Sequence, residues 1–88
     1  MKLYVLYRPD SEYARQVEEF IHDFTKVHPD RHIETVDLNT REGASKAELY
    51  DVVMYPAILA TSNDGQLLKS WEGPELPLMN ELAYYAHD

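Results

Sequence analysis

The chain has 88 residues, of which 16 are acidic and 8 are basic, and its net charge at pH 7 is −8. A chain of this length forms a small hydrophobic core, and we expect a single domain over residues 1–88. The negative charge repels phosphate groups, so we expect neither nucleic acid nor an anionic membrane as a partner.

The sequence contains no cysteine, which excludes disulfides, thiolate nucleophiles and thiolate metal ligands. His22, His28 and His32 lack the spacing of metal ligands on one helix face, so we predict no metal site, no cofactor and no catalytic residue. The apolar run before Arg8 is too short for a signal peptide, and no run reaches the ~18 residues of a membrane span. We therefore expect a cytoplasmic protein.

Residues 2–7 (KLYVLY) predict a strand with apolar side chains on both faces, as in a central strand. Residues 8–11 break this strand, and Asp10 or Ser11 is predicted to cap a helix that ends near Pro29. The apolar residues of this helix recur at helical spacing and are expected to face the core. They are Tyr13, Val17, Phe20, Ile21, Phe24 and Val27.

Residues 31–38 predict a second strand. Two strands separated by one helix form a βαβ unit, so we expect them to be parallel with a right-handed crossover. The side chains of the second strand should alternate, with Val36 and Leu38 on one face and Ile33 on the other.

Residues 39–50 predict a shorter helix that Asn39 or Thr40 caps and that Gly43 weakens in its first turns. A helix of this length depends on packing for its stability, so one face should turn inward. The residues expected on that face are Ala44, Ala47 and Tyr50.

Residues 50–59 (YDVVMYPAIL) form an apolar run that contains one proline. Pro56 cannot donate to a sheet ladder, so we predict a turn with the next strand beginning at Ala57. A cis Tyr55–Pro56 bond would reconcile the proline with this strand, since it costs only ~0.5–1 kcal/mol over the trans form.

Residues 57–61 and 66–71 predict a hairpin, because Asp64-Gly65 lies between two apolar runs. Residues 76–86 predict a final helix whose inward-facing residues are Leu78, Met79, Leu82 and Tyr85. Trp71 is expected either to pack beneath this helix or to join the surface at Tyr55. An amphipathic helix must bury its apolar face, so a four-stranded mixed sheet with helices on both faces is the compact arrangement.

This order of elements resembles the thioredoxin and glutaredoxin superfamily over essentially the whole chain. Residues 50–59 are similar to the thioredoxin segment that reads YGIRGIPTL, residues 63–65 to the hairpin turn KNG, and Gly73 to the glycine that closes the fourth strand. The resemblance implies a thioredoxin-like α/β fold with strand order 2-1-3-4 and the third strand antiparallel. A shorter likeness in residues 2–5, Pro9 and Ser11 points to the circadian-clock KaiB family, which also has a thioredoxin-like form without the redox motif.

The sequence departs from the superfamily where the redox chemistry resides. Ser11 and Ala14 stand where glutaredoxins carry the two cysteines of CPYC, and Val5 stands where many thioredoxins carry a buried acid. Dithiol exchange needs one thiolate that attacks and another that leaves. We therefore expect no thiol-disulfide oxidoreductase activity and a protein that is not an enzyme.

The resemblance also implies a binding groove, because the residue before the cis proline presents its backbone to an extended partner chain in thioredoxin-like proteins. We expect a protein or peptide to bind in a groove formed by Tyr7, Ser11, Tyr13, Tyr55 and Pro56. Two alternatives remain. The first is a transferase-like protein or one that binds glutathione or another anionic small ligand at Ser11, where a helix begins. The second is a structural module that self-associates, as a monomer or a weak homodimer.

Overall fold

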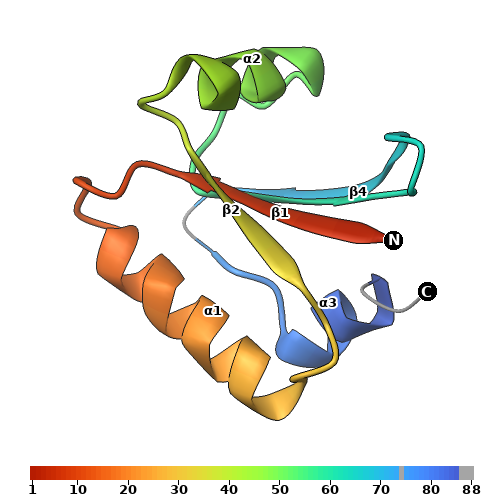
Figure 1. Ribbon diagram of the computed structural model, residues 1–88. Helices are drawn as coiled ribbons and strands as arrows, with labels where there is room; N and C mark the ends of the chain where they lie inside the picture. The colour runs from red at the N-terminus through yellow and green to blue at the C-terminus, as the bar shows by residue number, and fades with distance from the viewer. Residues whose placement is uncertain (74, 86–88) are drawn as a thin grey trace.

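The computed structural model describes residues 1–73 and 75–85. It contains a four-stranded sheet with helices above and below it (Figure 1). The elements in chain order are β1 (Lys2–Tyr7), α1 (Ala14–Val27), β2 (Ile33–Asp37), α2 (Arg41–Leu49), β3 (Ala57–Thr61), β4 (Leu67–Glu72) and α3 (Met79–Tyr85).

The strand order in the sheet is β2-β1-β3-β4, as predicted. β1 pairs with β2 in parallel and with β3 in antiparallel orientation, and β3 pairs with β4 in antiparallel orientation. Tyr7 lies opposite Asp37, and Leu6 lies opposite Ala57. The end of β1 therefore lies beside the start of β3, where Pro56 enters the sheet.

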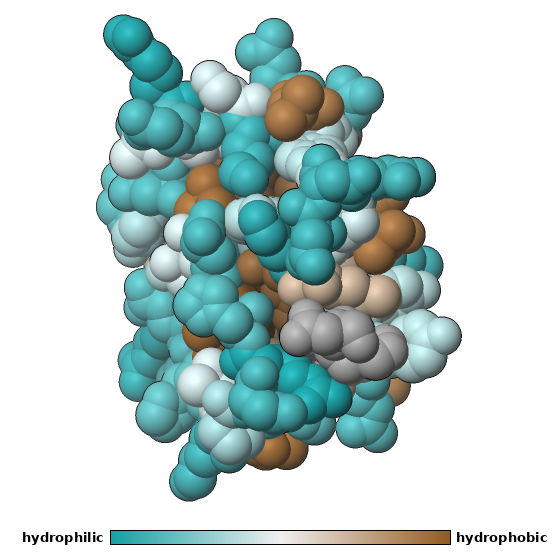
Figure 2. All heavy atoms as spheres, turned by 45° about the vertical axis from the view of Figure 1, so that its right-hand side comes forward, coloured by the Kyte–Doolittle hydropathy of each residue, from teal (hydrophilic) through white to brown (hydrophobic). Residues whose placement is uncertain are grey.

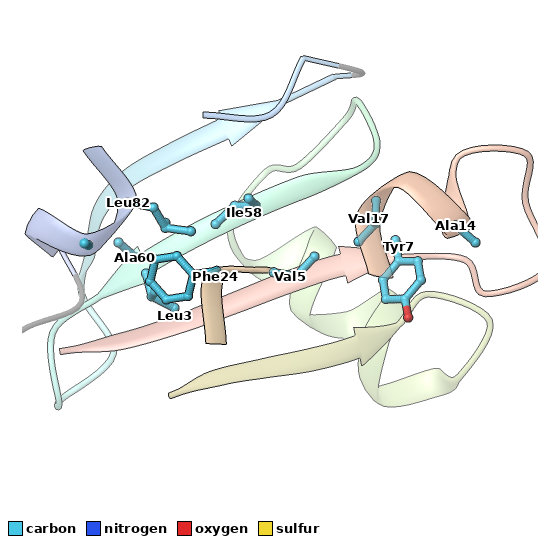
Figure 3. Packing of buried hydrophobic residues seen from close by; sticks show 10 residues of the cluster. Leu3, Val5, Tyr7, Ala14, Val17, Phe24, Ile58, Ala60 and Leu82 are labelled. Carbon is cyan, nitrogen blue, oxygen red and sulfur yellow. The ribbon is translucent and has the colours of Figure 1, made fainter. Parts of the chain in front are cut away.

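α1 and α3 cover one face of the sheet, which we call the α1 face (Figures 1 and 3). Phe24 is completely buried between the sheet and the helices, and Leu82 of α3 packs into the same cluster. Successive side chains of a strand point to opposite faces of the sheet, so every second residue of β1 and β3 faces α1 and α3. The cluster consists of Leu3, Val5, Tyr7, Ala14, Val17, Phe24, Ile58, Ala60, Leu82 and Ala83.

α2 covers the other face, which we call the α2 face. It contributes little side-chain volume, since Gly43 and Ala47 are its buried residues. A Cβ atom on Gly43 would lie 2.0 Å from the Asp37 carbonyl oxygen, so only glycine allows the helix to approach β2 this closely. The cluster on this face consists of Leu6, Val36, Leu38, Ala47, Val52, Ala57 and Leu59.

Several predicted helix details are wrong. α1 begins at Ala14 after Tyr13, which makes no side-chain capping bond, so neither Asp10 nor Ser11 caps it. Val27 and Ala44 are exposed because the helices turn their neighbouring residues inward. Leu78 is also exposed, since α3 begins only at Met79. The predicted end of this helix at Ala86 lies outside the described residues.

Other local predictions are confirmed. Thr40 caps α2, since its Oγ1 accepts a hydrogen bond from the Gly43 N–H at 3.0 Å. The hairpin joins β3 to β4, with a bulge at Ala60 and Thr61 that the sequence did not indicate.

The surface carries no continuous hydrophobic area on the face that Figure 2 shows. Its hydrophobic side chains form separate patches among hydrophilic ones (Figure 2). None of the helices within residues 1–73 and 75–85 combines the length and apolar character needed to span a membrane.

Candidate functional site

The connection between α2 and β3, residues 50–56, forms a loop at the end of the sheet where β1 stops. The Tyr55–Pro56 peptide bond in this loop is cis, which confirms the prediction. Asp51 has a positive φ of 55°, a conformation that aspartate tolerates better than most residues. We call residues 50–56 the cis-proline loop.

Hydrogen bonds from the end of β4 hold the cis-proline loop. The Glu72 carboxylate accepts from the N–H groups of Val53 at 2.9 Å and Met54 at 3.4 Å. The N–H of Gly73 donates to the Pro56 carbonyl at 3.0 Å. Gly73 has a positive φ of 101°, and the Met54 side chain lies directly over it. The loop and the end of β4 therefore form one unit.

The Tyr55 N–H is the backbone N–H of this loop that has no hydrogen-bond acceptor among the described residues. The Val52 N–H donates to the Ala47 carbonyl, and Glu72 takes the next two amides. No group among the described residues accepts a hydrogen bond from the Tyr55 N–H. Pro56 has no N–H, so a backbone donor stands alone directly before the cis bond.

The Tyr55 side chain is half-buried and packs on the α2 face. Its hydroxyl donates to the Val52 carbonyl at 3.2 Å, and the Arg8 guanidinium lies 5.3 Å from the ring centroid. A cation at this distance over an aromatic ring is attracted by the ring electrons. Arg8 is exposed and was not among the predicted site residues. In the sequence, only its position directly after the apolar strand 2–7 indicates that Arg8 lies at the end of the sheet.

Exposed apolar side chains surround the loop. Leu49 is 72% exposed, Val53 78% and Met54 54%. We call these three residues the apolar rim. Val53 and Met54 were not predicted at the surface because they lie within the apolar run 50–59, and Leu49 directly precedes that run.

Tyr7 is part of the core. Its ring is 7% exposed and lies near Val17 on the α1 face, and its hydroxyl donates to Glu18 Oε2 at 3.0 Å (Figure 3). Burial, the hydrogen bond to Glu18 and the negative charges of Glu18 and Asp37 raise the pKa of Tyr7 to about 12. Tyr7 is therefore a core residue of the α1 face, and its hydroxyl is engaged by Glu18.

Ser11 and Tyr13 lie in the turn between β1 and α1. The Ser11 hydroxyl donates to the Arg8 carbonyl at 2.6 Å, and Tyr13 packs half-buried against the α1 face. Asn39 donates to Asp10 at 3.0 Å and so ties this turn to the one that precedes α2. The predicted site residues thus lie at one end of the sheet but are divided between its two faces.

Trp71 packs beneath the terminal helix, which was the first of its two predicted positions. Its Nε1 donates to Glu81 at 3.0 Å, and its ring meets Tyr85 edge-on with centroids 5.5 Å apart. A hollow of about 260 Å³ lies at the opposite end of β1 from the cis-proline loop, lined partly by Leu3 and His32. Within residues 1–73 and 75–85, no three histidine or carboxylate side chains are grouped to hold a metal ion.

No protein-family model and no curated protein match this chain. Solved structures with a similar fold include the following two. A designed protein is 23% identical with a TM-score of 0.71, and the match covers 96% of this chain and 70% of that one. Oxidized mitochondrial thioredoxin 3 from Saccharomyces cerevisiae is 17% identical with a TM-score of 0.70, and the match covers 96% of this chain and 74% of that one. The chain therefore has a thioredoxin-like fold, and its sequence contains no cysteine.

Proposed function

We propose that this chain is a non-redox thioredoxin-fold module that binds an extended segment of a partner protein along the cis-proline loop. The observation that carries the proposal is the Tyr55 amide, which has no acceptor among the described residues while the amides before it are all engaged. An extended segment beside Tyr55 would supply that acceptor, as a neighbouring strand does in a sheet.

The residues around this amide favour a protein partner. The apolar rim leaves three large side chains in water beside the loop, and apolar side chains of a partner would cover them. The half-buried Tyr55 ring offers a large contact area at little cost in side-chain entropy. Glu72 and Gly73 hold the loop in place before binding, so little ordering is required of it.

The chemistry of the chain supports binding without thiol exchange. Ser11 and Ala14 replace the attacking and leaving thiols, and the Ser11 hydroxyl already donates to a backbone carbonyl. A serine nucleophile needs a base next to it. Among the described residues, the hydrogen bonds of Ser11 join it to Arg8 and Ala14 and to no histidine or carboxylate.

The proposal is tested with two matched substitutions. Val53→Asn places an uncharged polar side chain in the apolar rim, and Leu78→Asn places one at an equally exposed residue before α3, since the exposed fractions are 78% and 77%. We expect Val53→Asn to weaken partner binding about tenfold, a change of ~1.4 kcal/mol, while Leu78→Asn leaves it unchanged. Circular dichroism should show both variants folded.

The partner is found by affinity capture from a lysate of the native cells, and segments of the captured protein are then titrated into the ¹⁵N-labelled chain. We expect the amide signal of Tyr55 to shift most. Equal capture by the two variants, or shifts confined to residues outside the cis-proline loop, would contradict the proposal.

A further inference from the structure

The apolar rim alternates with acidic residues along the chain. The sequence from Glu48 to Met54 is ELYDVVM, which places Glu48 and Asp51 beside Leu49 and Val53. Both carboxylates are exposed, and neither forms an ion pair with a described residue. The surface beside the loop on the α2 side therefore combines exposed apolar groups with two uncompensated negative charges.

Lys46 and Arg8 lie against aromatic rings and form no ion pair with Glu48 or Asp51 among the described residues. The Lys46 ammonium lies 3.7 Å from the centroid of the Tyr4 ring and 5.9 Å from that of Tyr50, which directs it toward the sheet. Arg8 stacks on Tyr55 from the β1 side. Positive charge thus borders the loop on the β1 side, and unpaired negative charge borders it on the α2 side.

We propose that the partner segment is a basic one, in which lysine or arginine residues flank the apolar side chains that cover the rim. This inference rests on the proposed function and adds the chemistry of the partner to it. The basic residues of the partner pair with Glu48 and Asp51 on the α2 side of the loop. Because Arg8 lies on the β1 side, this pairing also sets the direction in which the segment lies along the loop. The net charge of −8 adds long-range attraction for such a segment.

The test uses a random peptide library displayed on phage and selected on the wild-type chain. Recovered peptides are synthesised and titrated against Glu48→Gln/Asp51→Asn, which removes both charges and keeps a residue that tolerates positive φ at position 51. The control, Glu19→Gln/Asp23→Asn, removes two charges from the exposed side of α1. We expect enrichment of lysine and arginine, and affinities about threefold to tenfold lower for the first variant than for the control.

Several results would overturn the inference. If peptides that shift the Tyr55 amide carry no excess of basic residues, the proposed function stands and the basic partner is rejected. If both double variants weaken binding equally, net charge alone explains the attraction, and the specific role of Glu48 and Asp51 is wrong. If the selected peptides are acidic and Arg8→Gln abolishes their binding, the charge assignment is reversed. If basic peptides bind without shifting Tyr55, both the proposed function and this inference fail.

Discussion

The two faces of the sheet are covered by different means. On the α1 face, the 14-residue helix α1 and helix α3 bury large side chains, with Phe24 and Leu82 fully enclosed. On the α2 face, a helix of 9 residues lies close to β2 because Gly43 has no side chain. Both faces bury apolar side chains of the sheet, but α1 and α3 add large apolar side chains of their own, whereas α2 adds close backbone contact at Gly43.

This difference matters for the candidate site, because the cis-proline loop follows α2 directly. Hydrogen bonds join the loop to Ala47 of α2 and to Glu72 and Gly73 at the end of β4. Substitutions on the α1 face should therefore change global stability. Substitutions on the α2 face should change both global stability and the conformation of the cis-proline loop.

The largest effect is expected for Phe24→Ala, because the ring is completely buried. Loss of its packing and the cavity left behind should lower the free energy of unfolding by about 3–5 kcal/mol, measured by chemical denaturation. The control Val27→Ala, at an exposed position of the same helix, should change it by less than about 0.5 kcal/mol. Similar losses in the two variants would show that α1 does not hold its face by burial.

Gly43→Ala tests the close approach on the α2 face. Alanine favours a helix over glycine by about 1 kcal/mol, yet its Cβ would overlap the Asp37 carbonyl oxygen. We expect a net loss of about 2–3 kcal/mol and shifted amide signals in the cis-proline loop. The control Ala44→Gly, at the exposed neighbour, should cost about 1 kcal/mol and leave the loop signals unchanged. A Gly43→Ala variant more stable than the wild type would refute the close approach.

Tyr7 makes the α1 face sensitive to alkaline pH. The folded state raises the pKa of Tyr7 to about 12 from its ordinary value of 10.0, so the unfolded chain loses this proton first. The contribution of the Tyr7 hydroxyl to the free energy of unfolding is fully present below about pH 10 and is lost as the pH rises toward about 12. Between pH 9.5 and 11.5 the wild type should lose about 1.5–2 kcal/mol more than Tyr7→Phe. Parallel losses in the two proteins would contradict the raised pKa.

Thr61→Val tests the smallest effect, at the hairpin end of β3. Thr61 is fully buried, and its hydroxyl has no hydrogen-bond partner among the described residues. Because an unpaired buried hydroxyl is costly, we expect valine to raise the free energy of unfolding by about 1 kcal/mol. The control Thr35→Val, at an exposed position of β2, should change it little. A loss of stability in Thr61→Val would mean that the hydroxyl is satisfied.

The order of elements was predictable because each carries a local signal. Alternating or helical spacing of apolar residues identified all seven elements, and Pro56 between an apolar loop and a strand indicated the cis bond. The cap of α1 was not predictable. Asp10 and Ser11 are residue types that often cap helices. Here the Ser11 hydroxyl donates to the Arg8 carbonyl within the turn, and the Asp10 carboxylate accepts from Asn39 of a distant turn, so neither side chain caps α1.

The candidate site was predicted only in part. Tyr55 and Pro56 lie where expected, whereas Arg8, Glu72 and the apolar rim were missed. Glu72 lies 18 residues from Met54 along the chain, and no local pattern links a carboxylate to an amide so far away. The apolar rim was missed because apolar residues are expected in the core, and the sequence does not show that no helix or strand packs over these three.

The sequence by itself determined the elements, the strand at which the proline turn ends and the absence of thiols, because these depend on local spacing and composition. Only the tertiary structure decided which amide stays open and on which side the negative charges lie. The pairing of β3 with β4 brings Glu72 to the loop, and the seating of α2 against Asp37 leaves Leu49, Asp51 and Val53 in water. Hydrogen bonds and burial are relations between segments far apart in the chain, so they are settled only when the sheet forms.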